Sequence, residues 1–209
     1  KHRLTLLRAL PDGVLRVLEQ IPATAHPMDV LRTGVSALGT MEPEPEARDA
    51  NIARDIADRL LACLPTMLAY WHHFSTTRTR IDCDSAATSI GGHFLHLLHG
   101  QAPSEQWERA MHASLILYAE HEFNASTFSA RVIAGTGSDM HSAITGAIGA
   151  LRGAKHGGAN EAALGIQERY ADGAVAERDI RERIANHEVI VGFGHPVYTV
   201  TDPRHALIK

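Results

Sequence analysis

Apolar residues recur every three or four positions along most of the chain, which is the spacing of one face of an α-helix. The longest such run starts near Ala47, and its apolar positions are Ile52, Ile56, Leu60 and Leu64. Asp55 and Arg59 lie one helical turn apart on the polar side of this run, so we expect them to form an ion pair. Pro65 lacks a backbone N–H, so we expect it to kink or break the helix.

Shorter helices are predicted from signals at their ends. Asp12 is expected to cap a short helix that ends before Pro22, and a second short helix is expected from Val30 to Leu38. The next helices are expected to stop at Gly100 and to start at Ser104, at Asn124, and at Ser138 or Asp139. Only residues 189–191 resemble a strand, and this run is too short to found a sheet, so the predicted fold class is mainly α.

Composition and charge narrow the function classes. Hydrophobic residues make up 44% of the 209 residues, and the formal net charge of −4 offers no basic surface for a nucleic acid. No apolar run approaches the ~20 residues that a membrane-spanning helix needs. The two cysteines, Cys63 and Cys83, are expected to be free thiols in a reducing compartment, which favours the cytoplasm.

Two of the histidines are set among glycines. His156 lies in K-H-G-G-A-N, between a helix expected to end near Gly153 and another expected to start near Ala159. His195 lies in G-F-G-H-P-V-Y, one helix's worth of sequence further on. Glycine lets the main chain approach a ligand closely or adopt a positive φ, so these segments are expected to build a site from loops. A helix N-terminus disfavours a cation, and a neutral imidazole such as that expected of His156 can donate a hydrogen bond to a developing oxyanion.

The other histidines allow a second interpretation, a histidine-rich metal-binding module. His93, His96 and His99 recur at three-residue intervals on one predicted helix. We expect no metal site, because these residues cover a broad helix face and neither C-x-x-C nor H-E-x-x-H occurs, so packing and surface hydrogen bonding is the simpler interpretation. A third interpretation is a non-catalytic dimerisation module, because the small residues Gly146 and Gly149 would allow close helix contact inside the fold or across a dimer.

Four long segments resemble the citrate synthase superfamily, and their order and spacing fit it. They read H-P-M-D-V-L-R-T-G-V-S, A-E-H-E-F-N-A-S-T-F, G-A-I-G-A-L-R-G-A-K-H-G-G-A-N-E and G-F-G-H-P-V-Y-T-V-T-D-P-R-H. The resemblance covers nearly all of the chain. Within the superfamily, G-F-G-H-P-V-Y-T and S-I-G-G-H-F-L-H-L-L-H-G are similar to the 2-methylcitrate synthase branch. Bacterial-type citrate synthases tend to read G-F-G-H-R-V-Y-K at the first of these.

The resemblance implies a citrate-synthase-like fold of many helices. Residues 1–155 would belong mostly to a large helical domain, and residues 156–209 would start a smaller one and carry active-site loops. The family's catalytic base is an aspartate in a motif downstream of T-D-P-R, which residues 1–209 do not reach. We therefore expect the sequence to be a piece of a longer protein, truncated on its C-terminal side, and we expect these 209 residues alone to be inactive.

The resemblance also implies roles for individual residues. His156 matches the histidine that hydrogen-bonds the thioester carbonyl and stabilises the enol, and His195 matches the histidine that binds and protonates the oxaloacetate carbonyl. His121 and Arg204 match oxaloacetate-binding residues, and Arg32 is a further candidate for that role. The implied coenzyme A contacts are Val189, Ile190, Val191, Gly192, Phe193 and Gly194.

The implied activity is an acyltransferase reaction in which propionyl-CoA, oxaloacetate and water give 2-methylcitrate and CoA, as in the methylcitrate cycle of propionate catabolism. A citrate synthase that uses acetyl-CoA is the nearest alternative, because one methylene is worth only ~1–3 kcal/mol of discrimination in a pocket. No permanently bound cofactor is implied, since the coenzyme A thioester is a substrate. We also expect the protein to form a homodimer, and to be located in the cytoplasm or, in a eukaryote, in the mitochondrial matrix.

Overall fold

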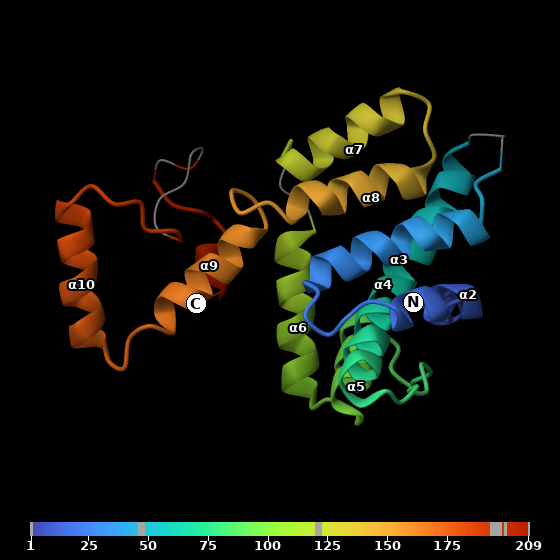
Figure 1. Ribbon diagram of the computed structural model, residues 1–209, viewed down its shortest axis with the longest axis horizontal. Helices are drawn as coiled ribbons and strands as arrows, with labels where there is room; N and C mark the ends of the chain where they lie inside the picture. The colour runs from blue at the N-terminus through green and yellow to red at the C-terminus, as the bar shows by residue number, and fades with distance from the viewer. Residues whose placement is uncertain (1, 46–48, 120–122, 193–197, 199, 209) are drawn as a thin grey trace. The chain divides into compact units, whose positions relative to one another are not determined.

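The computed structural model describes residues 2–45, 49–119, 123–192, 198 and 200–208, and the regular elements in these ranges are α-helices (Figure 1). In chain order they are α1 (His2–Thr5), α2 (Asp12–Glu19), α3 (Pro27–Met41), α4 (Ala50–Thr77), α5 (Ile90–His99), α6 (Glu105–Tyr118), α7 (Ala125–Gly135), α8 (Met140–Leu151), α9 (Gly158–Gln167), α10 (Gly173–Ala185) and α11 (His205–Ile208). Residues 189–191, which resemble a strand in sequence, form no strand. The mainly α class is confirmed.

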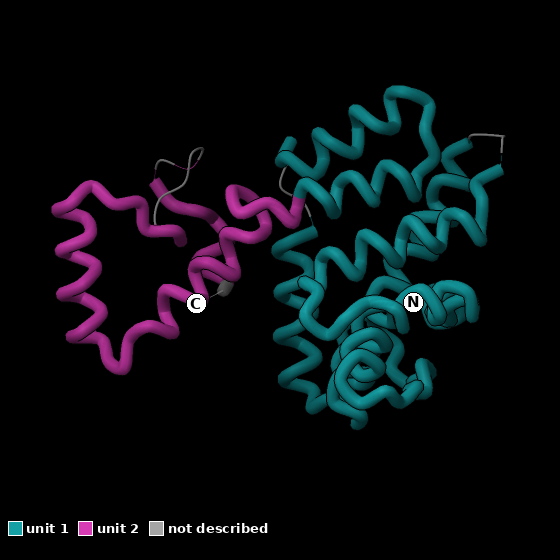
Figure 2. The backbone as a smooth tube through the Cα atoms, viewed as in Figure 1, with its two compact units in different colours: residues 1–150 teal, residues 151–209 magenta. Residues whose placement is uncertain are grey.

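The chain divides into two compact units, residues 1–150 and residues 151–209 (Figure 2). The first unit contains helices α1 to α7 and nearly all of α8, and the second contains α9 to α11. The assignment of residues 1–155 and 156–209 to the family's large and small domains stays a prediction. Within the described ranges, no helix combines the length and the apolar character needed to span a bilayer.

The core of the first unit lies where α2, α3 and α4 pack against one another, as the blue to teal helices of Figure 1 show. Its buried members are Val14, Leu18, Val30, Val35, Leu38, Leu60, Cys63, Met67, Tyr70, Trp71 and Ile148. Each large apolar side chain contributes roughly 1.5–3 kcal/mol when it is fully removed from water. The same i, i+3 and i+4 spacing that predicts the helices therefore also brings their apolar faces together.

Helix α4 continues through Pro65, so the prediction that proline could break the helix here is wrong. Proline deprives the carbonyl of Leu61 of its helical donor. The Leu61 side chain is 52% exposed, so this side of the helix faces water, which can satisfy the carbonyl. On the buried side, Cys63 and Met67 have no exposed surface, and their packing holds the helix together around the proline. The helix starts at Ala50, after an Asp49 cap, rather than near Ala47.

Arg59 pairs with Glu42, so the predicted pair with Asp55 is wrong. Arg59 Nε lies 2.9 Å from Glu42 Oε2, and Nη2 lies 2.7 Å from Oε1. Arg59 Nη1 donates to two backbone carbonyls, at 2.6 Å and 2.8 Å, which belong to Leu7 and Ala9. Asp55 binds Arg3 instead. A guanidinium fork satisfied by one bidentate carboxylate and two carbonyls is stronger than a single exposed pair along a helix.

Most predicted helix ends are confirmed. Gly100 ends α5 with a φ of 68°. Ser104 and Asn124 cap α6 and α7 through their side-chain oxygens, and Asp139 accepts from the Ser142 backbone N–H at the start of α8. Asp12 is an exception, because Pro11 is the N-cap of α2 and Asp12 pairs with Arg16 inside the first turn. The helix predicted from Val30 to Leu38 is longer, since His26 caps it at Pro27 and it runs to Met41.

His93 is completely buried in α5, so the expectation of packing is confirmed for this residue and surface hydrogen bonding is wrong. The Thr66 hydroxyl lies 3.0 Å from its Nε2, and the Ser85 hydroxyl lies 2.9 Å from its Nδ1. A neutral imidazole can donate to one hydroxyl and accept from the other. Burial, aided by the charge of Arg8 and by His96 and opposed by Asp84, lowers the pKa of His93 to about 4.

Stability is expected to fall as the pH drops from about 6.5 to 4, because of His93. In this window the unfolded chain, with an ordinary histidine pKa, binds the proton and the folded chain does not. The lost stability amounts to about 3 kcal/mol once the pH is below both values. The test is the free energy of unfolding of the full-length protein across this range, compared with His93→Gln. A wild-type slope equal to that of the variant would contradict the assignment.

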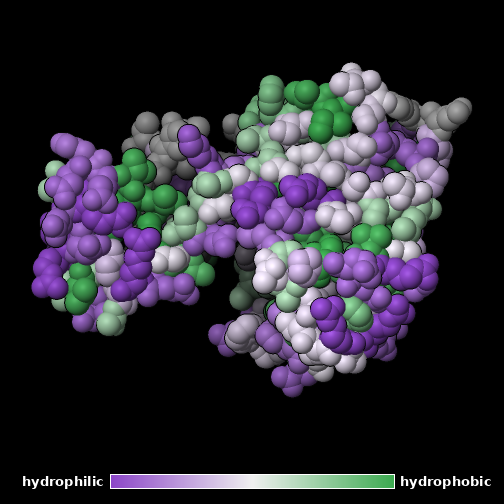
Figure 3. All heavy atoms as spheres, viewed as in Figure 1, coloured by the Kyte–Doolittle hydropathy of each residue, from purple (hydrophilic) through white to green (hydrophobic). Residues whose placement is uncertain are grey.

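Helices α6 and α7 carry large apolar side chains that the described chain leaves exposed. They are Trp107, Leu115, Ile116, Tyr118, Phe128 and Val132. Figure 3 shows hydrophobic residues gathered on the surface over α7. Gly146 of α8 makes its contact inside the fold, because a Cβ there would clash with Ile133 Cδ1 in α7.

Candidate active site

The turn that carries His156 connects α8 to α9 in the second unit. The His156 N–H donates to the Gly153 carbonyl at 2.9 Å, and the Gly158 N–H donates to the same oxygen at 3.2 Å. The Ala159 N–H donates in turn to the His156 carbonyl at 3.1 Å. His156 therefore stands two residues before the first residue of α9, half-buried, as the sequence predicts. Its backbone is fixed on both sides, which suits a side chain that must keep one direction.

Gly157 is required by packing within this turn. Its backbone is right-handed, with a φ of −62°, so conformational freedom is not the reason. A Cβ at this position would lie 2.5 Å from the Leu151 carbonyl oxygen and 2.6 Å from Leu151 Cδ1. The close approach at Gly157 is therefore one of the chain to itself at the end of α8, and the predicted approach to a ligand stays a prediction.

Gly157→Ala is expected to destabilise the protein by about 2 kcal/mol, because the added Cβ would meet a backbone carbonyl oxygen, that of Leu151, which yields less easily than a flexible side chain. Gly165→Ala in α9 is the matched control, since a Cβ there meets nothing within 4 Å. The free energy of unfolding of this control should rise by roughly 0.5–1 kcal/mol, because alanine favours a helix more than glycine does. The measurement is the urea midpoint of both variants, and equal midpoints would refute the packing argument.

Two helices, α9 and α10, lie between His156 and His195 in the sequence. The expectation that a single helix separates them is therefore wrong. The break follows Gln167, and Asp172 starts α10 by accepting from the Val175 N–H at 2.9 Å. After α10, the described part of the implied coenzyme A segment, residues 189–192, is held at two points. Ile190 is 6% exposed, and a Cβ on Gly192 would lie 3.0 Å from the Ala163 Cβ of α9. Gly192 also has a φ of +97°, which residues other than glycine rarely adopt.

Arg204 is bound by a carboxylate of its own chain. Its Nη2 lies 2.6 Å from Asp202 Oδ2, its Nε lies 3.0 Å from Oδ1, and its backbone N–H donates to Oδ1 at 2.9 Å. Asp202 belongs to the T-D-P-R turn, as the sequence indicates. The fork geometry that predicts carboxylate binding is therefore present, and Asp202 engages it here.

Arg32 lies in the first unit, on α3. Its Nη2 is 3.0 Å from Asp29 Oδ1, and its side chain is 45% exposed. It lines a small groove with a volume of about 430 Å³, together with Thr33, Ser36, Ala37, Thr40 and Thr145. The structure therefore puts Arg32 in a different unit from His156 and Arg204. Four further candidates, His121, Phe193, Gly194 and His195, lie outside the described residues.

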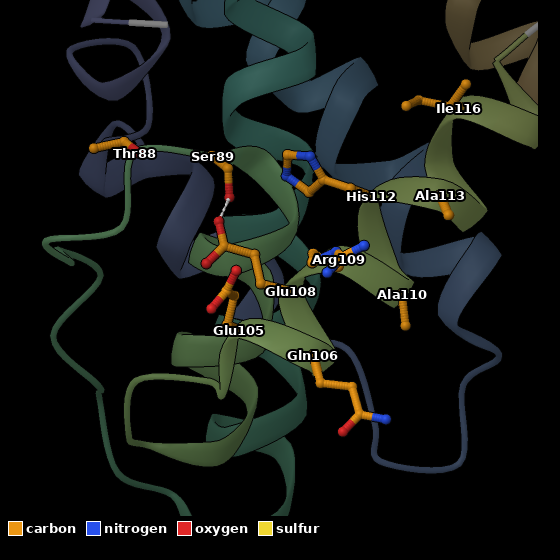
Figure 4. Close-up of a pocket in the computed structure, with 10 residues that line it drawn as sticks. All are labelled: Thr88, Ser89, Glu105, Gln106, Glu108, Arg109, Ala110, His112, Ala113 and Ile116. Carbon is orange, nitrogen blue, oxygen red and sulfur yellow. Dashed lines mark hydrogen bonds between the residues drawn. The ribbon is translucent and has the colours of Figure 1, made fainter.

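A larger open groove, of about 1130 Å³, runs along α6 and contains none of the predicted site residues (Figure 4). Glu105 and Glu108 point toward Ser89, and the Ser89 hydroxyl donates to Glu108. Among the described residues, no three His, Cys, Asp or Glu side chains are arranged to hold a metal ion. Of the two glutamates in this groove, Glu108 is hydrogen-bonded by the Ser89 hydroxyl.

Neither cysteine is placed for nucleophilic chemistry. Both are free thiols, as predicted. Burial, offset in part by Arg59, raises the pKa of Cys63 to about 12. Burial and the neighbouring Asp82 raise the pKa of Cys83 to about 11. Because the thiolate is the reactive form, thiol catalysis at neutral pH is disfavoured at both positions.

Comparison with known proteins decides the family. Residues 1–209 match the family described as citrate synthase, C-terminal domain. The chain belongs to the citrate synthase family. The 2-methylcitrate synthase of Shewanella oneidensis is 53% identical over 209 residues, which are 100% of this chain and 55% of that protein. The 2-methylcitrate synthase of Mycobacterium tuberculosis is 42% identical over 206 residues, 97% of this chain and 51% of that protein.

Solved citrate synthases share the fold. The enzyme of Thermotoga maritima superimposes with a TM-score of 0.84 at 32% identity, over 99% of this chain and 54% of that one. The enzyme of Thermoplasma acidophilum, solved in a ternary complex with carboxymethyl coenzyme A and oxaloacetate, superimposes with a TM-score of 0.86 at 28% identity, over 99% of this chain and 55% of that one. The chain thus spans about half the length of the citrate synthase family members that it matches.

Proposed function

We propose that the protein containing this chain condenses propionyl-CoA with oxaloacetate and water to give 2-methylcitrate and CoA. The observation that carries the proposal is the 53% identity to a 2-methylcitrate synthase along all 209 residues. The geometry of the His156 turn, the packed 189–192 segment and the carboxylate-binding fork of Arg204 supports it.

His156 is assigned to the acyl thioester. A base must accept the proton next to the thioester carbonyl, and the family resemblance gives this role to an aspartate downstream of the T-D-P-R segment. Loss of the proton puts negative charge on the carbonyl oxygen, and a hydrogen bond donated by the imidazole stabilises that charge. The enol carbon then attacks the ketone carbon of oxaloacetate and forms the new C–C bond. The turn bonds at Gly153 and Ala159 support this role, because a fixed donor needs no reorganisation during the reaction.

The oxaloacetate side of the site is assigned to His195, His121 and Arg204, with Arg32 as a further candidate. His195 would give a proton to the ketone oxygen as it becomes a hydroxyl, which is general acid catalysis. Arg204 would bind a substrate carboxylate through its fork. Water finally cleaves the thioester of the condensed product. This step releases CoA and makes the overall reaction irreversible.

Acetyl-CoA is the second candidate substrate, in which case the activity is that of a citrate synthase. A relative from Bacillus subtilis, 36% identical over 210 residues, is named citrate/2-methylcitrate synthase, which favours keeping this possibility. The two acyl groups differ by one methylene, so the expected ratio of kcat/KM is about 10 to 200.

The test is release of free CoA by the purified full-length protein, with oxaloacetate and either propionyl-CoA or acetyl-CoA. A larger kcat/KM for propionyl-CoA supports the proposal. A larger value for acetyl-CoA assigns citrate synthase activity instead. No release from either thioester would contradict the condensation itself.

The assembly and compartment are part of the same proposal. A homodimer is supported by the family and by the exposed apolar side chains of α6 and α7, which a second copy could cover. A cytoplasmic location is supported by the two free thiols. No permanently bound cofactor is required, because coenzyme A enters as the thioester and leaves as the product.

A further inference from the structure

The C-terminal end of α10 sets the direction in which the chain leaves toward residues 189–192. His187 is left-handed, with a φ of 60°, although it is not a glycine. The Glu188 N–H donates to the Arg183 carbonyl at 2.9 Å, and the His187 N–H donates to the Ile184 carbonyl at 3.0 Å. These two bonds make a Schellman motif, which closes the helix and reverses the chain.

The Arg183 side chain reinforces this motif from outside the backbone. Its Nε lies 2.9 Å from Glu188 Oε2, and the side chain is only 18% exposed. Side-chain hydrogen bonds to Glu188 and Tyr170 raise the pKa of Arg183. Tyr170, just after α9, donates in turn to Asp179 of α10. Arg183 therefore joins the end of α9, the body of α10 and the residue that precedes the 189–192 segment.

Glu188 is the last residue before that segment, which we call the acyl-CoA loop (residues 189–192). Beyond Glu188 the described loop is held by buried Ile190 and by the contact of Gly192 with α9. Val189, between Glu188 and Ile190, is 84% exposed and provides no anchor. The ion pair with Arg183 is thus the side-chain contact that fixes the leading end of the loop.

We propose that Arg183 is a positioning residue for acyl-CoA binding, acting through Glu188 on the acyl-CoA loop. The inference rests on the proposed function, which assigns this loop to coenzyme A. Without the ion pair, the loop would have to be ordered when the thioester binds, and that cost would appear in its affinity. Oxaloacetate is assigned to other residues, so its binding should not change.

The experiment compares Arg183→Gln with Arg181→Gln in the full-length protein. Arg181 lies on the same helix, is 76% exposed, and pairs with Glu177 at 2.7 Å, so it controls for loss of a charge on α10. We expect Arg183→Gln to raise the KM for propionyl-CoA on the order of tenfold and to leave the KM for oxaloacetate unchanged. Arg181→Gln should match the wild type. Glu188→Gln should reproduce the effect of Arg183→Gln, and the double variant R183E/E188R should restore the low KM.

A second readout separates this inference from the proposed function. Calorimetry measures the Kd of free CoA for the wild type and for Arg183→Gln. If the wild type binds CoA without turnover and Arg183→Gln weakens binding about tenfold, the inference stands and the proposed reaction fails. Equal Kd and KM values for Arg183→Gln and Arg181→Gln would overturn the inference while the enzyme assignment stands. Parallel losses in both KM values with no rescue by the double variant, or no CoA binding by the wild type, would also overturn it.

Discussion

Replacing His156 with glutamine is expected to lower kcat for condensation by about 10²–10³-fold. Under the proposed role of His156, the substitution replaces the imidazole N–H with an amide N–H, which is a less acidic and differently placed donor for the developing enolate oxygen. Charge develops on that oxygen only as the proton leaves the thioester, so the weakened hydrogen bond belongs to the transition state and kcat falls rather than KM rising. The turn around His156 consists of backbone bonds to Gly153 and from Ala159, which the substitution leaves in place.

The measurement is steady-state release of CoA from propionyl-CoA by the full-length variant. His72→Gln is the matched control, because His72 is an exposed histidine of α4 and contacts the ring of His73. That control should keep the wild-type kcat. A His156→Gln variant with wild-type kcat would remove His156 from the reaction, and a variant with only a raised KM would make it a binding residue.

Replacing Arg59 with methionine is expected to destabilise the protein by about 3 kcal/mol. The Arg59 side chain is 15% exposed, and its guanidinium binds the Glu42 carboxylate and two backbone carbonyls that precede α2. The variant would therefore lose the polar contacts that join α4 to both segments. Methionine keeps the apolar length of the side chain, so the change isolates the polar contacts. Glu42 is left partly buried without its partner, which adds to the loss.

Arg16→Met provides the comparison for this effect. Arg16 also pairs with a carboxylate, that of Asp12, but its side chain is 65% exposed. Loss of this ion pair in Arg16→Met should lower the free energy of unfolding by less than about 0.5 kcal/mol. Urea unfolding of the full-length protein measures both variants, and similar midpoints for the two would mean that burial adds nothing to the Arg59 contacts.

The local parts of the fold are predictable because their causes are local. Ser104 and Asn124 cap helices through bonds to N–H groups two or three residues away, so the signal and its effect lie in the same stretch of sequence. The partner of Arg59 depends on which residues 17 and more than 50 positions away arrive beside it, and spacing along one helix does not contain this. Pro65 is similar, because buried neighbours keep α4 intact where local propensity predicts a break.

The candidate site also combines features that the local sequence predicts with features that depend on contacts it does not contain. The glycines predict a tight turn at His156, but the atom that requires Gly157 is the Leu151 carbonyl, at the end of the preceding helix. Arg183 gave no signal in the sequence analysis. The left-handed residue that closes α10 is His187 rather than glycine, and the partner Glu188 lies across that turn. An arginine in the last turn of a helix, five residues before a glutamate, is the pattern that could have indicated it.

The pairing of Arg204 with Asp202 has a consequence for the entropy of substrate binding. A free arginine side chain loses about 2 kcal/mol of rotamer freedom when a ligand immobilises it. Here the guanidinium is oriented by Asp202 when the chain folds, so an arriving carboxylate meets a donor group whose torsions are already restricted. The same contact makes Asp202 a competitor for the donors that it orients. Under the role proposed for Arg204, a substrate carboxylate therefore replaces Asp202 at the guanidinium instead of binding a group without a partner.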